Sequence, residues 1–109
     1  MPDLTGLREL QKETQEWRDR NFPGEDAAHQ ALGVCEEAGE IAHAVLKMDQ
    51  GIRGDKEKHL LDLEDGIGDL IIFAMGLATN YNLNIDECLQ ETWNRVKERD
   101  WKRNPVDGS

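Results

Sequence analysis

Two groups of acidic side chains, about one helix apart, could together hold a metal ion. The first comprises Glu36, Glu37 and Glu40, and the second comprises Asp65 and Asp69. Residues three or four apart on a helix lie on one face, so each group projects its carboxylates together. Clustered carboxylate oxygens suit Mg²⁺ or Mn²⁺. Mg²⁺ in turn indicates phosphate chemistry.

The surroundings of Asp69 strengthen this hypothesis. Asp69 directly precedes the run 70–75, which is apolar on every side of a helix. Such a helix is normally buried, so we expect Asp69 to be buried or nearly so. A buried carboxylate is costly unless it is paired or coordinated, and a cation would remove that cost. For the segment 36–40 alone, a solvated helix face is the plainer alternative.

The chain is predicted to fold as four helices, at about residues 4–20, 26–48, 55–80 and 84–101, because apolar residues recur there with helical spacing. Asp55 is a candidate N-cap for the third helix, and Asn84 or Asp86 for the fourth. Residues 104–109 are expected to form a frayed tail. Short connections favour antiparallel neighbours. The predicted fold class is therefore all-α: one domain over 1–109, an antiparallel bundle of about four helices that oligomerises through helix faces.

Composition excludes several partners. The chain has 109 residues and a formal net charge of −10, which disfavours nucleic acid as a ligand because binding to nucleic acid depends on Lys and Arg. No apolar run approaches the roughly 20 residues of a membrane span, and the N-terminus lacks the apolar segment of a signal peptide. Cys35 and Cys88 are expected to be reduced thiols. We therefore expect a cytoplasmic protein that binds neither nucleic acid nor membrane.

The segment 36–44, Glu-Glu-Ala-Gly-Glu-Ile-Ala-His-Ala, and the later Asp69 resemble the MazG family of all-α nucleoside triphosphate pyrophosphohydrolases. That family carries E-E-x-x-E on one helix and E-x-x-D, or a related acidic pair, on the next. Here the third position before Asp69 is Gly66, and Asp65 stands one residue earlier on the same helix face. Three further segments resemble the family as well, at 17–22, 50–54 and 93–101.

The resemblance implies an enzyme that converts an NTP or dNTP to the monophosphate and pyrophosphate, in housekeeping of the nucleotide pool. It implies that Glu37, Glu40 and Asp69 hold Mg²⁺, or Mn²⁺ as a substitute, with Asp65 as the fourth ligand. Glu36 would support these ligands or act as a base for the attacking water. The catalytic set would then be Glu36, Glu37 and Glu40.

Six further residues are candidates for substrate binding. Asn94 and Lys97 match a phosphate-contacting pair of the family, and two other cationic residues could serve the same end. Cations near a helix C-terminus also stabilise the helix itself, which is the plainer alternative. Trp17 could stack on a base or pack in the core. The full set is Trp17, Asn21, Lys47, Arg53, Asn94 and Lys97.

Two other interpretations compete with the enzyme. A carboxylate-bridged di-iron bundle needs two Glu-x-x-His pairs, and only Glu40 with His43 has that spacing. A non-catalytic acidic helical module that binds a protein partner would explain the charge and the helices, but not an aspartate ahead of a buried run. For the enzyme itself, a chain this short could leave an apolar face for a partner, and the resemblance implies dimers or tetramers, so we expect a homo-dimer or homo-tetramer.

Overall fold

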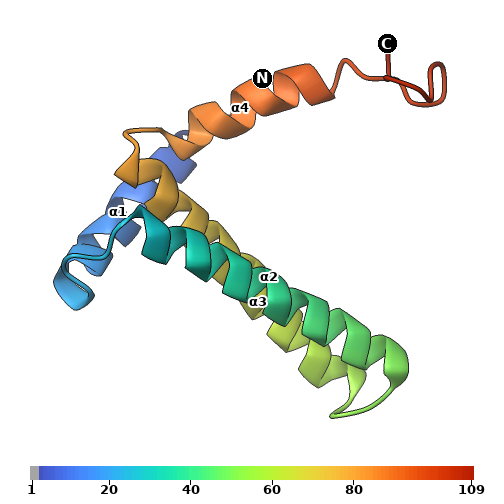
Figure 1. Cartoon of the computed structure of the whole chain (residues 1–109), viewed down its shortest axis with the longest axis horizontal. Coiled ribbons are helices and arrows are strands. Elements are labelled where there is room, and N and C mark those ends of the chain that lie inside the picture. Colours follow the sequence, from blue (N-terminus) through green and yellow to red (C-terminus); the bar gives the residue numbers. More distant parts are fainter. Residues whose placement is uncertain (1–2) are drawn as a thin grey trace.

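The computed structural model of the chain describes residues 3–109 and contains four helices (Figure 1). They are α1 (Thr5–Asn21), α2 (Ala27–Gln50), α3 (Lys56–Asn80) and α4 (Ile85–Val96). No strand occurs within residues 3–109, so the predicted all-α class is confirmed. The first two residues of the predicted 1–109 domain lie outside the described part. None of the helices in this part combines the length and apolarity that crossing a membrane requires.

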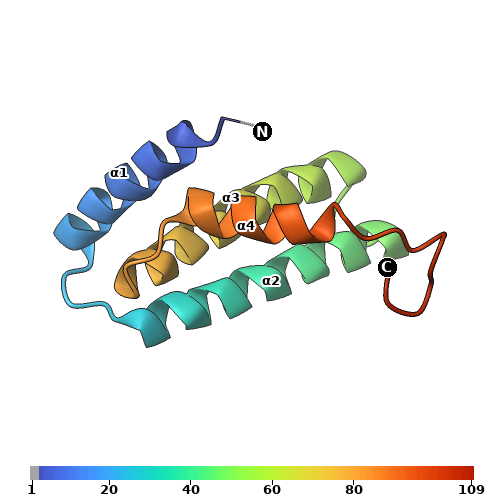
Figure 2. The ribbon, with the colours of Figure 1, turned by 90° about the horizontal axis from the view of Figure 1, so that it is seen from above.

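The helices α2 and α3 form a long antiparallel hairpin, which both ribbon views show as two helices side by side (Figures 1 and 2). Glycines let the two helices approach closely. A side chain at Gly33 would overlap the ring of Phe73, and a Cβ at Gly66 would lie 2.9 Å from Ile41 Cγ1. The small residues therefore set the distance between the two helices that carry the acidic groups.

Local signals fix the ends of the hairpin helices. Asp26 accepts a hydrogen bond from the His29 backbone N–H at 3.1 Å, and the His29 side chain completes a capping box. Asp55 accepts from the Lys58 backbone N–H at 2.8 Å, so its prediction as an N-cap is confirmed. Gly51 ends α2 in the left-handed conformation, at φ 70°, which glycine adopts without strain.

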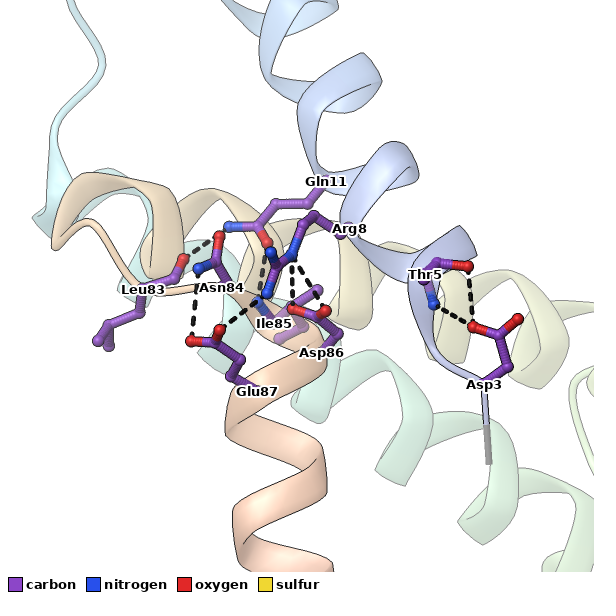
Figure 3. Close-up of polar contacts among 9 residues, drawn as sticks. All are labelled: Asp3, Thr5, Arg8, Gln11, Leu83, Asn84, Ile85, Asp86 and Glu87. Carbon is purple, nitrogen blue, oxygen red and sulfur yellow. Dashed lines mark hydrogen bonds and ion pairs between the residues drawn. The ribbon is translucent and has the colours of Figure 1, made fainter. Parts of the chain in front are cut away.

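The start of α4 is fixed by α1 (Figure 3). The Gln11 side-chain nitrogen donates to the Leu83 carbonyl at 2.9 Å, and its oxygen accepts from the Ile85 N–H at 2.8 Å. Asn84 occupies the N-cap position of α4, but its side chain makes no capping hydrogen bond. Gln11 of α1 supplies the capping bond in its place. Beside it, the Arg8 guanidinium lies 3.1 Å from an oxygen of Asp86. These contacts determine the direction in which α4 leaves the body.

Beyond α4 the chain differs from expectation. The fourth helix was predicted to reach Trp101, but α4 ends at Val96. The Asp100 side chain accepts hydrogen bonds from two backbone N–H groups downstream, at 3.2 and 3.0 Å. Such local bonds compete with the helix. Residues 104–109, expected to be a frayed tail, form turns, and the Gly108 carbonyl accepts from the Asp100 N–H at 2.7 Å.

The apolar core is small. Among the described residues the buried apolar side chains are Ala44, Met75 and Ala78. The run 70–75 was expected to be buried on all sides, yet Ile71 and Ile72 remain 43% and 37% exposed, and Asp69 is half-buried. The expectation is wrong for the single chain. Within residues 3–109, α2, α1 and α4 all contact α3, but they leave Ile71 and Ile72 partly exposed.

Candidate metal centre

Three carboxylates converge on one face of α2. Glu36, Glu37 and Glu40 each offer one oxygen, and these oxygens all lie within 4.8 Å of one another. Glu37 is buried, with 6% of its surface exposed, while Glu36 and Glu40 are exposed. The spacing of one and three residues brings them together on a helix, as the sequence predicted. The resemblance implies for Glu36 either a supporting role or that of a base, and one of its oxygens lies in the same group as those of Glu37 and Glu40.

The electrostatics of this carboxylate cluster are unfavourable without a cation. Glu37 Oε2 is buried and has no hydrogen-bond partner among the described residues. Burial, together with the negative charges of Glu40, Asp69 and Glu36, raises the pKa of Glu37 from 4.5 to about 7. An orphaned buried oxygen surrounded by like charges is what a divalent cation would satisfy. The donor set therefore fits a hard metal ion such as Mg²⁺ or Mn²⁺.

The second acidic group lies on the same side of the hairpin. Asp69 is close enough to help raise the pKa of Glu37. A cavity of about 280 Å³ is lined by Glu40 of α2 together with Asp65 of α3. A neighbouring cavity of about 490 Å³ contains both Asp65 and Asp69. The two aspartates thus border the cluster of glutamates, although the group within 4.8 Å comprises the glutamates alone among residues 3–109.

Gly66 occupies the position where the MazG signature often has Glu, and the packing explains why a side chain is absent there. Its Cα faces Ile41 of α2, and an added Cβ would lie 2.9 Å from Ile41 Cγ1. A larger residue would push the helices apart. The carboxylate one residue earlier, Asp65, is exposed and free of this constraint.

Asp62, a nearby carboxylate on α3, has a cationic partner, unlike the three glutamates of the cluster. Asp62 accepts a hydrogen bond from Lys58 Nζ at 2.7 Å, and this bond lowers the pKa of Asp62 below its usual value. Lys58 lies one turn before Asp62 on α3. No ion pair of this kind reaches Glu36, Glu37 or Glu40 within residues 3–109. Within residues 3–109 a lysine side chain therefore neutralises Asp62, and no basic side chain forms an ion pair with the cluster of glutamates.

An aromatic cavity lies beside Asp69. Its volume is about 470 Å³, and its lining includes Trp17, Phe22 and Asp69. The Trp17 and Phe22 rings meet edge to face, with centroids 5.8 Å apart. Trp17 is therefore placed where a flat ligand next to the carboxylates could contact it. Asn21 is not among the residues that line this cavity. Its side-chain nitrogen donates to the Trp17 carbonyl at 2.8 Å.

Two residues of this cavity were missed by the sequence interpretation. Phe22 was treated only as part of the segment that ends the first helix. Arg18 is buried, and its guanidinium donates to the Ile72 carbonyl at 3.1 Å and to Gln15 Oε1 at 2.8 Å. Its partners lie up to 54 residues away in sequence, so no local pattern could reveal them.

The other four substrate-binding candidates lie elsewhere. Lys47 Nζ donates to Gln50 Oε1 at 2.9 Å, and Asn94 Oδ1 accepts from Gln90 at 3.1 Å. Arg53 lies in the loop between α2 and α3, and Lys97 follows the last residue of α4. None of these four lines the three cavities described above, of about 280, 490 and 470 Å³. Within one chain they are not assembled with the cluster.

Comparison with known proteins adds no evidence on the chemistry of this site. No protein-family model matches the chain, and no curated protein matches it.

Proposed function

We propose that the chain is a Mg²⁺-dependent pyrophosphohydrolase that converts a nucleoside triphosphate to the monophosphate and pyrophosphate. One observation carries the proposal: a buried carboxylate oxygen of Glu37 has no partner and lies amid like charges. Isolated acidic surface clusters do not bury an orphaned oxygen, because the cost is high. The resemblance of segment 36–44 to the MazG signature adds the reaction and the substrate class.

The metal ligands in this proposal come from both helices of the hairpin. Glu37 and Glu40 would hold Mg²⁺ or Mn²⁺, with Asp69 and Asp65 at the border of the site. A bound divalent cation would screen the triphosphate, polarise the attacked phosphorus and lower the pKa of a bound water. Glu36 is exposed beside these ligands, and in this proposal it accepts a proton from the attacking water.

The aromatic cavity supplies a place for the base. A nucleobase in the cavity of about 470 Å³ would contact Trp17 and Phe22, while its phosphates extend past Asp69 toward the glutamates. Aromatic side chains stack on any base, so this contact gives affinity rather than strict selection. The buried Arg18 forms part of the cavity wall and offers a fixed positive charge near the carboxylates.

The test is a pyrophosphate-release assay with Mg²⁺ across all ribo- and deoxyribonucleoside triphosphates, with EDTA as a control. We expect metal-dependent release from at least one substrate. Glu40→Gln should reduce the rate by roughly 100-fold or more, since loss of a group behind the ligands already costs 10–100-fold. The matched control is Glu91→Gln, an exposed carboxylate on α4 that should leave the rate unchanged.

Two results would contradict the proposal. One is equal release with and without EDTA. The other is a wild-type rate in Glu40→Gln with helicity intact. Mg²⁺ binding without release from any substrate would favour a non-catalytic acidic module that kept the metal site alone.

A further inference from the structure

Arg18 is a buried cation without a carboxylate partner. Its side chain lies in the wall of the aromatic cavity, and 5% of its surface is exposed. Nη1 and Nη2 donate to Gln15 and to the Ile72 carbonyl, which are both neutral acceptors. None of the ion pairs within residues 3–109 includes Arg18. Burying a charged group is costly unless it is hydrogen-bonded, so the donors that remain on Arg18 favour an acceptor brought by a ligand.

The nitrogen Nε is the donor of Arg18 that remains for a ligand. It makes no hydrogen bond with any residue in the described range 3–109. No nitrogen of Arg18 is among the buried side-chain atoms that lack a partner in that range, so Nε is open to solvent. A Cβ at position 76 would lie 2.5 Å from Nη1, so Gly76 makes room for the guanidinium. The guanidinium is therefore held through Nη1 and Nη2 and open at Nε.

Glu25 supplies an acceptor in the wall of the same cavity. Its Oε2 accepts from Nε2 of the fully buried Gln30 at 3.1 Å, which fixes the carboxylate, and its Oε1 makes no hydrogen bond with a described residue. Burial lowers the pKa of Arg18, and the negative charge of nearby Glu25 opposes this shift. The two opposite charges still form no direct ion pair within residues 3–109, so a gap separates a fixed donor from a fixed acceptor.

The charges around the cavity favour a neutral group over a phosphate. Three carboxylates line it, those of Glu13, Glu25 and Asp69, against the single cation of Arg18. Such a surrounding repels a phosphate unless a metal ion screens the charge. The base of a nucleotide, rather than its phosphates, therefore fits this cavity.

Nucleobases fall into two groups by the hydrogen-bonding groups that stand next to each other on their pairing edge. Guanine, hypoxanthine, uracil and thymine have a carbonyl oxygen beside a ring N–H. Adenine and cytosine have an amino group beside a ring nitrogen without a proton. A donor at Arg18 and an acceptor at Glu25 match the first arrangement. In the second arrangement the amino group would meet a donor, and the ring nitrogen would meet an acceptor.

We propose that Arg18 and Glu25 select the base of the nucleotide, favouring a carbonyl beside a ring N–H over an amino group beside an unprotonated ring nitrogen. The Arg18 Nε–H donates to the carbonyl oxygen, and Glu25 Oε1 accepts from the ring N–H. Trp17 and Phe22 contact every base alike, so the discrimination comes from the two charged residues. The inference rests on the proposed function in taking a nucleotide as the ligand of the cavity.

Two pairs of nucleosides that differ in these groups alone test the proposal. Inosine and adenosine form one pair, and uridine and cytidine form the other. Nuclear magnetic resonance titration of the purified chain in EDTA measures their affinities without metal or turnover. We expect inosine to bind roughly tenfold or more tighter than adenosine, and uridine to exceed cytidine in the same way, because a hydrogen bond to a charged group contributes about 10–100-fold.

Glu25→Gln should remove this preference. The new amide oxygen would accept from Gln30 in place of Oε2, so the amide NH₂ group would face the ring N–H of inosine and two donors would meet. The matched control is Glu16→Gln, an exposed glutamate of α1 that does not line the aromatic cavity. It should keep the wild-type preference. The two nucleoside pairs test the wild type directly, whether or not the variant folds.

Equal affinities within both pairs, tighter binding of adenosine and cytidine, or no binding of any of the four nucleosides overturns the proposal. A folded Glu25→Gln variant that keeps the wild-type preference overturns it as well. A preference for inosine without pyrophosphate release from any nucleoside triphosphate would overturn only the proposed function. Release with equal kcat/KM from inosine and adenosine triphosphates would overturn only the selection of the base.

Discussion

The two sides of the α2–α3 hairpin are built from neighbouring residues, yet they are incomplete in different ways. On one side, Glu37 has a buried oxygen without a partner and a pKa raised to about 7. On the other side, Ile67 and Ile71 are apolar and uncovered. The first deficit is electrostatic and should respond to cations and pH. The second is hydrophobic and offers no charge on which a cation or a proton could act.

The largest expected effect is a loss of Mg²⁺ affinity, from a substitution that changes the carboxylate side alone. Glu37→Gln keeps the shape of the side chain but removes the charge that a cation would bind. We expect Mg²⁺ affinity to fall by roughly 100-fold or more, because a buried anionic ligand contributes more than the groups behind it. Isothermal titration calorimetry measures this directly. Glu57→Gln, an exposed glutamate in the first turn of α3, is the control and should bind as the wild type does.

The same variant also tests the electrostatic deficit in the absence of a metal. Glu37→Gln should unfold at a higher temperature than the wild type in EDTA at pH 8, because an uncompensated buried charge has been removed. Unchanged Mg²⁺ affinity in this variant would show that the cluster is not the metal site.

The next effect concerns the packing of α2 against α3. Gly33→Ala would place a methyl group in the ring of Phe73, and an aromatic ring cannot yield as a flexible side chain can. We expect a loss of about 1–3 kcal/mol in the free energy of unfolding, measured by urea denaturation. Gly39→Ala on the same helix meets nothing within 4 Å. It should gain up to about 1 kcal/mol from helix propensity.

Equal effects at Gly33 and Gly39 would contradict the packing of the hairpin. They would show that helix propensity alone decides both positions, and that the distance between α2 and α3 is not set at Gly33.

Much of the fold could be predicted from the sequence because its signals are local. The Asp55 cap, the glycines after α2 and the apolar spacing lie within a few residues of the structure they specify. The same holds for Glu36, Glu37 and Glu40, whose convergence follows from helix geometry alone. Asp65 and Asp69 were placed on the correct side because the two helices are adjacent in sequence and antiparallel.

The rest depends on contacts between distant segments. Gln11 caps α4 from 74 residues away, and Arg18 binds the carbonyl of Ile72 from 54 residues away. No spacing rule connects such pairs. The run 70–75 shows a different limit. Apolar periodicity predicts that a face will be covered, but it does not say whether the cover comes from the same chain or from another.

The last effect concerns pH, and Glu37 sets its sign. The pKa of Glu37 is raised from 4.5 to about 7 in the folded chain, so the folded state holds a proton that the unfolded state has released. This contribution to stability is fully present below pH 4.5 and is lost as pH rises through 7. Urea denaturation in EDTA should show the wild type losing stability over that window relative to Glu37→Gln.

Mg²⁺ should reverse this dependence, because a cation competes with the proton for the same oxygen. Below pH 7 the affinity should fall by up to about tenfold per pH unit, as one proton is displaced for each ion bound. Above pH 7 the affinity should level off. An affinity that stays constant across this pH range would contradict the assignment of Glu37 as a ligand, because no proton would then compete with the ion for its oxygen.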